Sequence, residues 1–171
     1  MKREKSVGSE NVPGTLFTAA EFLRDHVSHI PELIQAMRET ILEHSRQVPS
    51  AERVQPKNML ESRFTPAEEA FKKGMVSCGT LASISVEMLR HLGLKAKLVH
   101  GETNESVDHA WISVLDPEKG VWEDYDLTRE DATVTPQHIK KMETDSWEEI
   151  RERIEEDDRT REERKRTRGI E

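Results

Sequence analysis

The sequence contains a single cysteine, which excludes an internal disulfide. Unpaired thiols are the normal state in reducing compartments, whereas disulfides persist in oxidising ones. Residues 1–13 are polar and lack the apolar run of a secretion signal. The rest of the chain lacks an apolar segment long enough to span a bilayer. We therefore expect a cytoplasmic protein without a membrane partner.

An excess of basic residues is also missing. The chain has 26 lysines and arginines against 34 aspartates and glutamates, and its formal net charge is -8. General binding of nucleic acid requires the opposite balance, so we expect no nucleic-acid partner. Apolar residues make up only 34% of the chain and charged residues 35%. This composition predicts that some segments lie outside the core.

A length of 171 residues suits one domain with appended segments. We predict a loose lead-in over residues 1–17, a domain over residues 18–145 and a charged helical tail over residues 146–171. In the tail, opposite charges recur four residues apart, which supports an exposed helix. The apolar face of the tail ends at Ile154, so we expect the tail to fray or project. Its basic end makes it a candidate site for a protein partner.

Helix signals dominate the first half of the domain. A capping box at residues 18–21, flanked by two phenylalanines placed to form a hydrophobic staple, predicts a helix over residues 19–29. Apolar spacing after Pro31 predicts a second helix that Pro49 ends. Residues 50–63 are polar, and we expect them to be mostly loop.

The second half changes from helical to alternating patterns. A capping box at residues 65–68 predicts a short helix that stops at Gly74, and a stronger helix begins at Cys78 and ends before Gly93. Alternating residues then predict three strands, of which a five-residue turn joins the last two into an antiparallel hairpin. We place the strands at residues 95–99, 109–114 and 121–126. Further helices should open at Thr135 and Pro136 and at residues 145–148.

The position of Cys78 at the first turn of a helix has chemical consequences. A helix N-terminus presents unpaired N–H groups and a partial positive charge, and both favour a thiolate over a thiol. The same N–H groups can stabilise an oxyanion on a substrate carbonyl. Gly79 follows directly and leaves room for a substrate. Cys78 shares the apolar face of its helix, so its sulfur should point towards the sheet that follows.

His109 and Asp126 could complete a catalytic group. His109 opens one strand of the hairpin and Asp126 ends the other, so the two are predicted to be cross-strand neighbours. A carboxylate beside an imidazole fixes its tautomer and stabilises its charged form. Each residue also has a structural interpretation: a core cysteine, a surface histidine and a turn-capping aspartate. The catalytic interpretation therefore depends on the three occurring together.

The order of these motifs resembles the transglutaminase-like superfamily, whose members have a papain-like core. In that family the cysteine helix runs into an Arg-x-x-Gly-hydrophobic segment and a strand. A His-Ala-Trp strand and a tryptophan four residues before an aspartate then follow. The resemblance covers residues 65–128, through Cys78, residues 90–94, residues 109–111, Trp122 and Asp126. It implies an α+β fold in which the cysteine helix packs on a small antiparallel sheet, here with extra N-terminal helices and a charged C-terminal helix.

By this resemblance Cys78 would be the nucleophile, His109 the general base and acid, and Asp126 the orienting acid. The spacing from Trp122 selects Asp126 over Asp124. The implied activity is that of a cysteine peptidase, amidase or acyltransferase. It would act on an amide bond of a peptide or protein through a thioester, without a cofactor. Trp111 and Trp122 should pack the cleft side of the sheet, and with Gly79 they are the candidate substrate-binding residues.

Three features depart from the family pattern. Val76 stands two residues before the cysteine, where the family often has glycine, and Leu127 replaces the proline of Asp-Pro-Thr. The second group of the oxyanion hole has no evident counterpart, and Gln55 and Asn58 are the candidates. An inactive module that binds a peptide in the same groove is the alternative function.

A metal protein is a further alternative. His26 and His29 lie three apart beside Asp25, with His44 further on, and helical spacing could bring two of them to one ion. The sequence has no second cysteine and no His-Glu-x-x-His pattern, so we predict no metal site.

Overall fold

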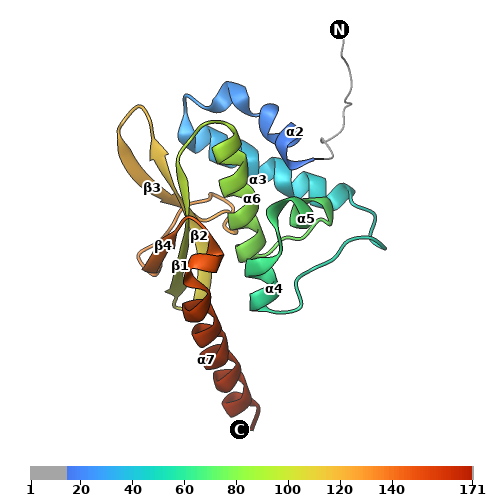
Figure 1. Ribbon diagram of the computed structural model, residues 1–171, viewed down its shortest axis with the longest axis vertical. Helices are drawn as coiled ribbons and strands as arrows, with labels where there is room; N and C mark the ends of the chain where they lie inside the picture. The colour runs from blue at the N-terminus through green and yellow to red at the C-terminus, as the bar shows by residue number, and fades with distance from the viewer. Residues whose placement is uncertain (1–14, 171) are drawn as a thin grey trace.

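The computed structural model describes residues 15–170. Along the chain, a series of helices comes first, the strands of one sheet follow, and a long helix comes last (Figure 1). The predicted lead-in therefore lies almost entirely outside the described residues. The elements are α2 (Leu16–Glu21), η1 (Arg24–His26), α3 (Ile30–Gln47), α4 (Met59–Phe64), α5 (Ala67–Lys72), α6 (Cys78–His91), β1 (Ala96–Thr103), β2 (Ser106–Asp116), β3 (Val121–Tyr125), β4 (Ile139–Thr144), η2 (Trp147–Ile150) and α7 (Arg151–Ile170).

The sheet has four antiparallel strands in the order β3-β2-β1-β4. The predicted hairpin of β2 and β3 is present, and its register runs from Asp116 opposite Val121 to Ile112 opposite Tyr125. Pairing with β3 therefore covers only the second half of β2. The first half of β2, which includes His109, extends beyond the end of β3.

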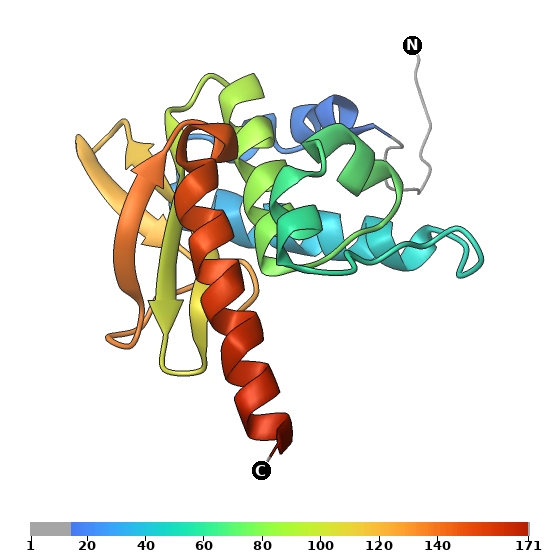
Figure 2. The same cartoon turned by 60° about the horizontal axis from the view of Figure 1, so that its bottom comes forward.

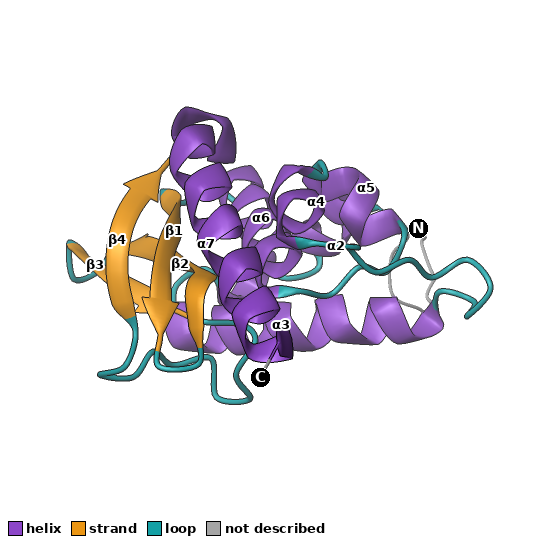
Figure 3. Ribbon diagram, turned by 90° about the horizontal axis from the view of Figure 1, so that it is seen from below, coloured by secondary structure: helices purple, strands orange, loops and turns teal. Residues whose placement is uncertain are grey.

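The core lies between the sheet and α6. Alternate residues of β2 face this helix, as the alternation predicts, and Ala110, Ile112 and Val114 are all buried. α6 contributes Ile84 and Met88, which are fully buried. The remaining helices pack around α6 on the same side of the sheet, as Figure 3 shows. The fold is thus α+β, with the cysteine helix packed on a small antiparallel sheet.

The first helix begins earlier than the capping box predicts. Thr15 is the N-cap, because its Oγ1 accepts a hydrogen bond from the Thr18 N–H at 3.1 Å. With this start, the apolar side chains on one face of the helix are buried in the core. Phe17 and Phe22 are exposed and do not form the predicted hydrophobic staple. The helix ends at Glu21 and a short 3-10 turn replaces its predicted second half. The buried stripe consists of Leu16, Ala19, Ala20 and Leu23.

One further prediction is confirmed and one is wrong. The polar segment over residues 50–63 is mostly loop, and α4 begins only at Met59, where Asn58 caps it through its Oδ1 and the N–H of Glu61 at 2.8 Å. Pro136 opens no helix, because β4 follows and pairs with the free edge of β1. By contrast, the helix after Pro31 and the helix from Cys78 to His91 are confirmed, and Gly74 ends α5 with a φ of 71°.

The C-terminal helix is continuous through residue 170, and its first half is part of the domain. Ile154 is completely buried and Asp157 is 8% exposed, so this end of α7 packs rather than frays. Figure 2 shows α7 running between the sheet and α4 before it projects beyond them. None of the described helices combines the length and apolarity that crossing a bilayer requires.

Ile154→Ala tests whether α7 belongs to the folding unit. Truncation of a fully buried isoleucine typically costs about 2–5 kcal/mol of unfolding free energy. We expect a loss of that size in urea unfolding, with one transition for the whole chain. The control is Ile139→Ala, because Ile139 is 51% exposed and its truncation should change the free energy by less than about 0.5 kcal/mol. An unchanged midpoint for Ile154→Ala would show that α7 unfolds independently.

Candidate active site

The first turn of α6 holds Cys78 in a fixed position. Ser77 is the N-cap: its Oγ accepts from the Thr80 N–H at 3.3 Å, and its own N–H donates to Thr80 Oγ1 at 2.9 Å. Ser77 Oγ also lies 2.6 Å from Ser62 Oγ on α4. This reciprocal capping occupies the N–H of Thr80 and leaves Cys78 at the exposed end of the helix dipole.

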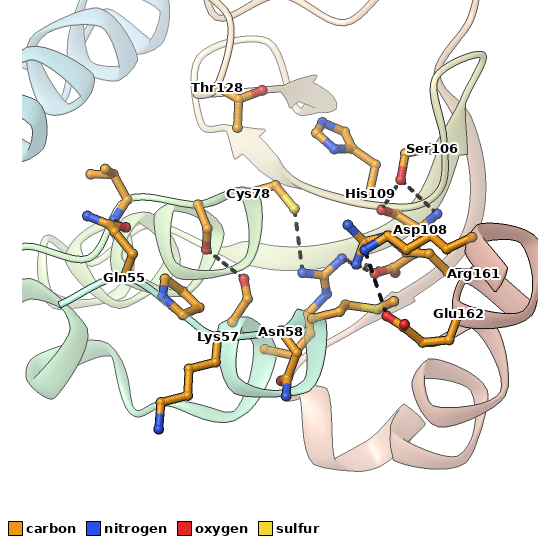
Figure 4. A pocket seen from close by; sticks show the side chains of 17 residues that line it. Gln55, Lys57, Asn58, Cys78, Ser106, Asp108, His109, Thr128, Arg161 and Glu162 are labelled. Carbon is orange, nitrogen blue, oxygen red and sulfur yellow. Dashed lines mark hydrogen bonds and ion pairs between the residues drawn. The ribbon is translucent and has the colours of Figure 1, made fainter. Parts of the chain in front are cut away.

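A cleft of about 660 Å³ opens beside the Cys78 thiol. Its walls come from residues 55–59, from the end of α4, from the start of β2 and from the second half of α7. Cys78 and His109 both line it, as Figure 4 shows. Segments that are far apart in the sequence therefore meet at one thiol.

His109 and Asp126 are direct neighbours. His109 Nε2 lies 2.8 Å from Asp126 Oδ2, so the Nδ1 side of the ring is left for the thiol of Cys78. The ring can reach both groups because β2 extends past the end of β3 at this point. Asp126 is buried, and Thr128 donates to its Oδ1 through both N–H and hydroxyl. Leu127 thus replaces proline without loss of the contact that Thr128 makes.

A second histidine binds the same carboxylate oxygen. His138 Nε2 lies 2.8 Å from Asp126 Oδ2, and its Nδ1 accepts the Thr135 N–H at 2.9 Å. Because Nδ1 is an acceptor, the ring proton is on Nε2, and Nε2 donates a hydrogen bond to Asp126. His138 therefore helps His109 to hold the same oxygen of Asp126. The sequence offered no signal for this residue, because it lies in a loop with no periodic pattern.

A buried arginine, which no sequence pattern indicates, also lies at the thiol. Arg63 Nη1 lies 3.5 Å from Cys78 Sγ, and Nη2 lies 3.0 Å from Asp108. The guanidinium also stacks over Trp147, 5.2 Å from its ring centre. Its side chain is completely buried. A cation without solvent needs anionic partners, and here these are the Asp108 carboxylate and the sulfur itself.

The pKa values favour a charged pair. Burial by itself raises the pKa of the Cys78 thiol, but the Arg63 guanidinium and then the His109 imidazole outweigh it and lower that pKa to about 6. Burial lowers the pKa of His109, yet its bonds to Asp126 and Cys78 raise it to about 9. Burial opposes ionisation of Asp126, but His109, Thr128 and His138 hold its pKa well below its usual range. Between about pH 6 and 9 the site thus holds a thiolate beside an imidazolium.

A chain of ionisable side chains links this site to α7. His100 is fully buried, with Nδ1 2.9 Å from Asp108 and Nε2 2.7 Å from Asp157. Lys141 and Arg153 approach the same oxygen of Asp157 at 3.5 and 3.4 Å. The contacts of Arg63 thereby extend from the thiol to the C-terminal helix.

The residues predicted to bind substrate do not line the cleft. A Cβ on Gly79 would lie 2.4 Å from Ser62 Oγ and 2.6 Å from Arg63 Nη1, so the space beside this glycine is filled by the protein. Trp111 is buried and donates to Asp124 at 3.0 Å, which keeps Asp124 away from His109. Trp122 is 43% exposed and lies under Lys97 at a separate surface pocket.

Gln55 and Asn58, the two candidates for the oxyanion hole, both line the cleft. Asn58 is occupied as the cap of α4. Gln55 Oε1 accepts the Val76 N–H at 3.0 Å, and its Nε2 donates to Gly74 at 3.3 Å. The Gln55 amide is thus fastened beside the segment that leads into Cys78. Only the backbone of Val76 makes this contact, so a side chain is tolerated where the family often has glycine.

The histidines of the metal hypothesis have other contacts. His29 caps α3 through Nδ1, and His44 stacks on Phe71 with ring centres 3.9 Å apart. Across residues 15–170, one trio of potential ligands gathers its atoms within 4.8 Å, namely His109, Asp126 and His138. Both histidines of this trio already hydrogen-bond to the Asp126 carboxylate.

Comparison with known proteins identifies the family of this fold. A family model of the transglutaminase-like superfamily matches residues 32–127, more than half of the chain. The chain therefore belongs to this superfamily. No curated protein sequence matches it.

Solved structures of similar fold are larger proteins. One is a proposed cysteine protease from Cytophaga hutchinsonii, with a TM-score of 0.50 and 14% identity over 80% of this chain and 46% of that one. Another is the periplasmic domain of TgpA from Pseudomonas aeruginosa, with a TM-score of 0.45 and 19% identity over 67% of this chain and 42% of that one. This chain spans less than half of either. At these identities the likeness concerns the fold.

Alkylation measures the state of the thiol directly, because Cys78 is the one cysteine in the chain. We expect the rate with iodoacetamide to reach half its maximum near pH 6, whereas a free cysteine does so at about pH 8.5. His109→Ala should move this midpoint upwards, because it removes a cation beside the sulfur. N-acetylcysteine serves as the reference. If Cys78 reacts only after the protein is unfolded, the cleft does not give reagents access to its thiol.

Proposed function

We propose that this protein is a cysteine hydrolase or acyltransferase that acts on an amide bond of a peptide or protein. One observation carries the proposal: a single thiol at a helix N-terminus accepts a hydrogen bond from Arg63 and shares its cleft with His109, which hydrogen-bonds to Asp126. This is the arrangement of nucleophile, base and orienting acid that covalent catalysis requires. The cleft beside the thiol gives a peptide access.

The proposed reaction has two halves. The Cys78 thiolate attacks the amide carbonyl, and the oxygen becomes an oxyanion that the N–H of Cys78 and the Gln55 amide can bind. The His109 imidazolium gives its proton to the amine, the C–N bond breaks, and a thioester remains on Cys78. His109, now neutral, takes a proton from water or from a second amine. Attack by that group releases a carboxylic acid or a new amide and restores the thiolate.

Asp126 and Arg63 support these steps differently. Asp126 orients the His109 ring and stabilises its charged form, and His138 fixes Asp126 in turn. Arg63 stabilises the thiolate before attack, when the negative charge is on sulfur. A thiolate that must persist also favours a reducing compartment, and we propose the cytoplasm on that ground.

A proteome digest tests the activity on many peptide sequences at once. The purified chain would be incubated with the peptides and a fluorescent primary amine, and products identified by mass spectrometry. We expect cleaved or amine-labelled peptides, and a thioester on Cys78 at early times. Cys78→Ala and His109→Ala should lower product formation by at least about a thousandfold. Peptide binding without any product that depends on Cys78 would identify an inactive binding module instead.

The pH dependence of kcat/KM should be bell-shaped. Below about pH 6 the thiolate is protonated, and above about pH 9 the imidazolium loses its proton, so activity should fall on both sides. Steady-state rates between pH 4.5 and 10.5 measure both limbs. If kcat/KM instead keeps rising up to pH 8.5 and shows no level region from about pH 6, a preformed ion pair would be excluded.

The paired variant Arg63→Gln with Asp108→Asn tests the contribution of the buried Arg63–Asp108 pair. Replacing both members avoids leaving a buried uncompensated charge. We expect the acidic limb to move upward by about two units, so that kcat/KM at pH 7 falls about tenfold. The alkaline limb, which reports His109, should stay near pH 9. If activity falls while both limbs of the pH profile stay in place, Arg63 has a structural role only. Thermal unfolding of the variant serves as the control for loss of fold.

A further inference from the structure

The C-terminal helix forms one wall of the cleft beside Cys78. Arg161 and Lys165 of α7 line this cleft, and Figure 4 shows Arg161 on the wall that faces the thiol. The same two residues also line an adjoining pocket of about 550 Å³, together with Arg164 and Arg168. A row of basic side chains thus runs from the thiol along the helix, and Glu102 and Glu105 also line the second pocket.

The helical phase explains this placement. Ile154 and Asp157 mark the buried face of α7, and Arg161 and Lys165 follow Asp157 by four and eight residues on the same face. The packed face of the helix therefore becomes basic where it leaves the core and passes the cleft. Asp157 fixes the position, because it bonds to the buried His100 at 2.7 Å.

The charges on this wall are only partly compensated. Earlier in α7, Arg151 pairs with Glu148 and Glu155, and Arg153 pairs with Asp157. Among the described residues, by contrast, no carboxylate lies within ion-pair distance of Arg161. Lys165 has one exposed partner, Glu162, at 3.9 Å. The cleft therefore carries a positive surplus in a chain whose formal net charge is -8.

The opposite wall adds to this surplus. Lys57 lines the cleft from the segment before α4, whereas the charge of Arg63 is matched by Asp108. Within the described part of the chain, Glu162 is the one carboxylate on the cleft wall that does not belong to the buried Arg63 group. A partner of negative charge would therefore gain attraction from both sides.

We propose that Arg161 and Lys165 bind a carboxylate of the substrate, so that the amide attacked by Cys78 lies in an acidic peptide. This inference rests on the proposed function and specifies its substrate class. A guanidinium binds a carboxylate through two parallel hydrogen bonds, and Lys165 adds a second positive charge one turn away. The carboxylate belongs either to an aspartate or glutamate side chain or to the C-terminus of the peptide.

The alkylation of Cys78 by charged and neutral reagents tests the surface without a substrate. Iodoacetate carries a carboxylate and iodoacetamide does not, so the ratio of their rates reports the charge near the sulfur. We expect Arg161→Glu with Lys165→Glu to lower this ratio about tenfold at low salt, and 0.5 M salt to reduce the difference. The rate with iodoacetamide should stay within about twofold.

A matched control lies on the same helix. Arg159 and Arg166 are exposed, line neither pocket and lie about half a turn away from the face of Asp157. Arg159→Glu with Arg166→Glu makes the same change in net charge and should change the ratio by less than about twofold. An equal fall in both variants would show a general charge effect and overturn the inference.

Peptide binding to the Cys78→Ala variant supplies the second arm. A glutamate-containing octapeptide should bind at least about fivefold more tightly than its glutamine counterpart, and the Arg161 and Lys165 substitutions should remove this difference. Peptides with free and amidated C-termini separate the two sources of the carboxylate. Equal affinities, or tighter binding of a single-stranded oligonucleotide, would overturn the inference.

The two proposals fail in different ways. A thiol that reacts rapidly with iodoacetamide but shows no effect of Arg161 and Lys165 leaves the proposed chemistry intact and removes the acidic substrate. A thiol that reacts with neither reagent removes the chemistry. In that case the binding of glutamate and glutamine peptides to the Cys78→Ala variant still decides the substrate class.

Discussion

The site depends on one buried cation that is shared between a sulfur and a carboxylate. Arg63 comes from α4, the thiol from α6 and Asp108 from β2, so the guanidinium joins three elements at one point. Taking a cation out of water costs several kcal/mol unless anions and hydrogen bonds replace the solvent. The need to satisfy that charge therefore constrains where the helix, the strand and the cysteine lie. The same requirement favours the ionised form of the sulfur. The buried guanidinium therefore both fixes the arrangement of these elements and stabilises the thiolate.

A second shared group organises the base. One oxygen of Asp126 receives both His109 and His138, and Thr128 holds the other oxygen. The two histidines have different duties because their second nitrogens face different partners. Nδ1 of His138 accepts a backbone N–H, whereas His109 faces the thiol. His138 is thereby held in a single tautomer, and under the proposed function the second nitrogen of His109 transfers the proton.

The sequence predicted the parts of the fold that local patterns control. The helix from Cys78 to His91 and the hairpin of β2 and β3 each have a period and a boundary that can be read over a few residues. These elements also bring Cys78, His109 and Asp126 together. Arg63 and His138 were beyond reach because both lie in segments without a readable periodic pattern, and their roles arise only from contacts with other elements. β4 was missed for a similar reason, since only the free edge of β1 makes that segment a strand.

The missing side chain at Gly79 has a consequence for how this site could be lost. The place where a Cβ would go is taken by Ser62 and by the guanidinium of Arg63. Even an alanine at this position would displace the cation from the sulfur while every member of the Cys-His-Asp group stayed in the sequence. Under the proposed function, Gly79→Ala would therefore abolish activity through one methyl group beside Cys78. Inspection of the three reactive residues alone would classify such a protein as active.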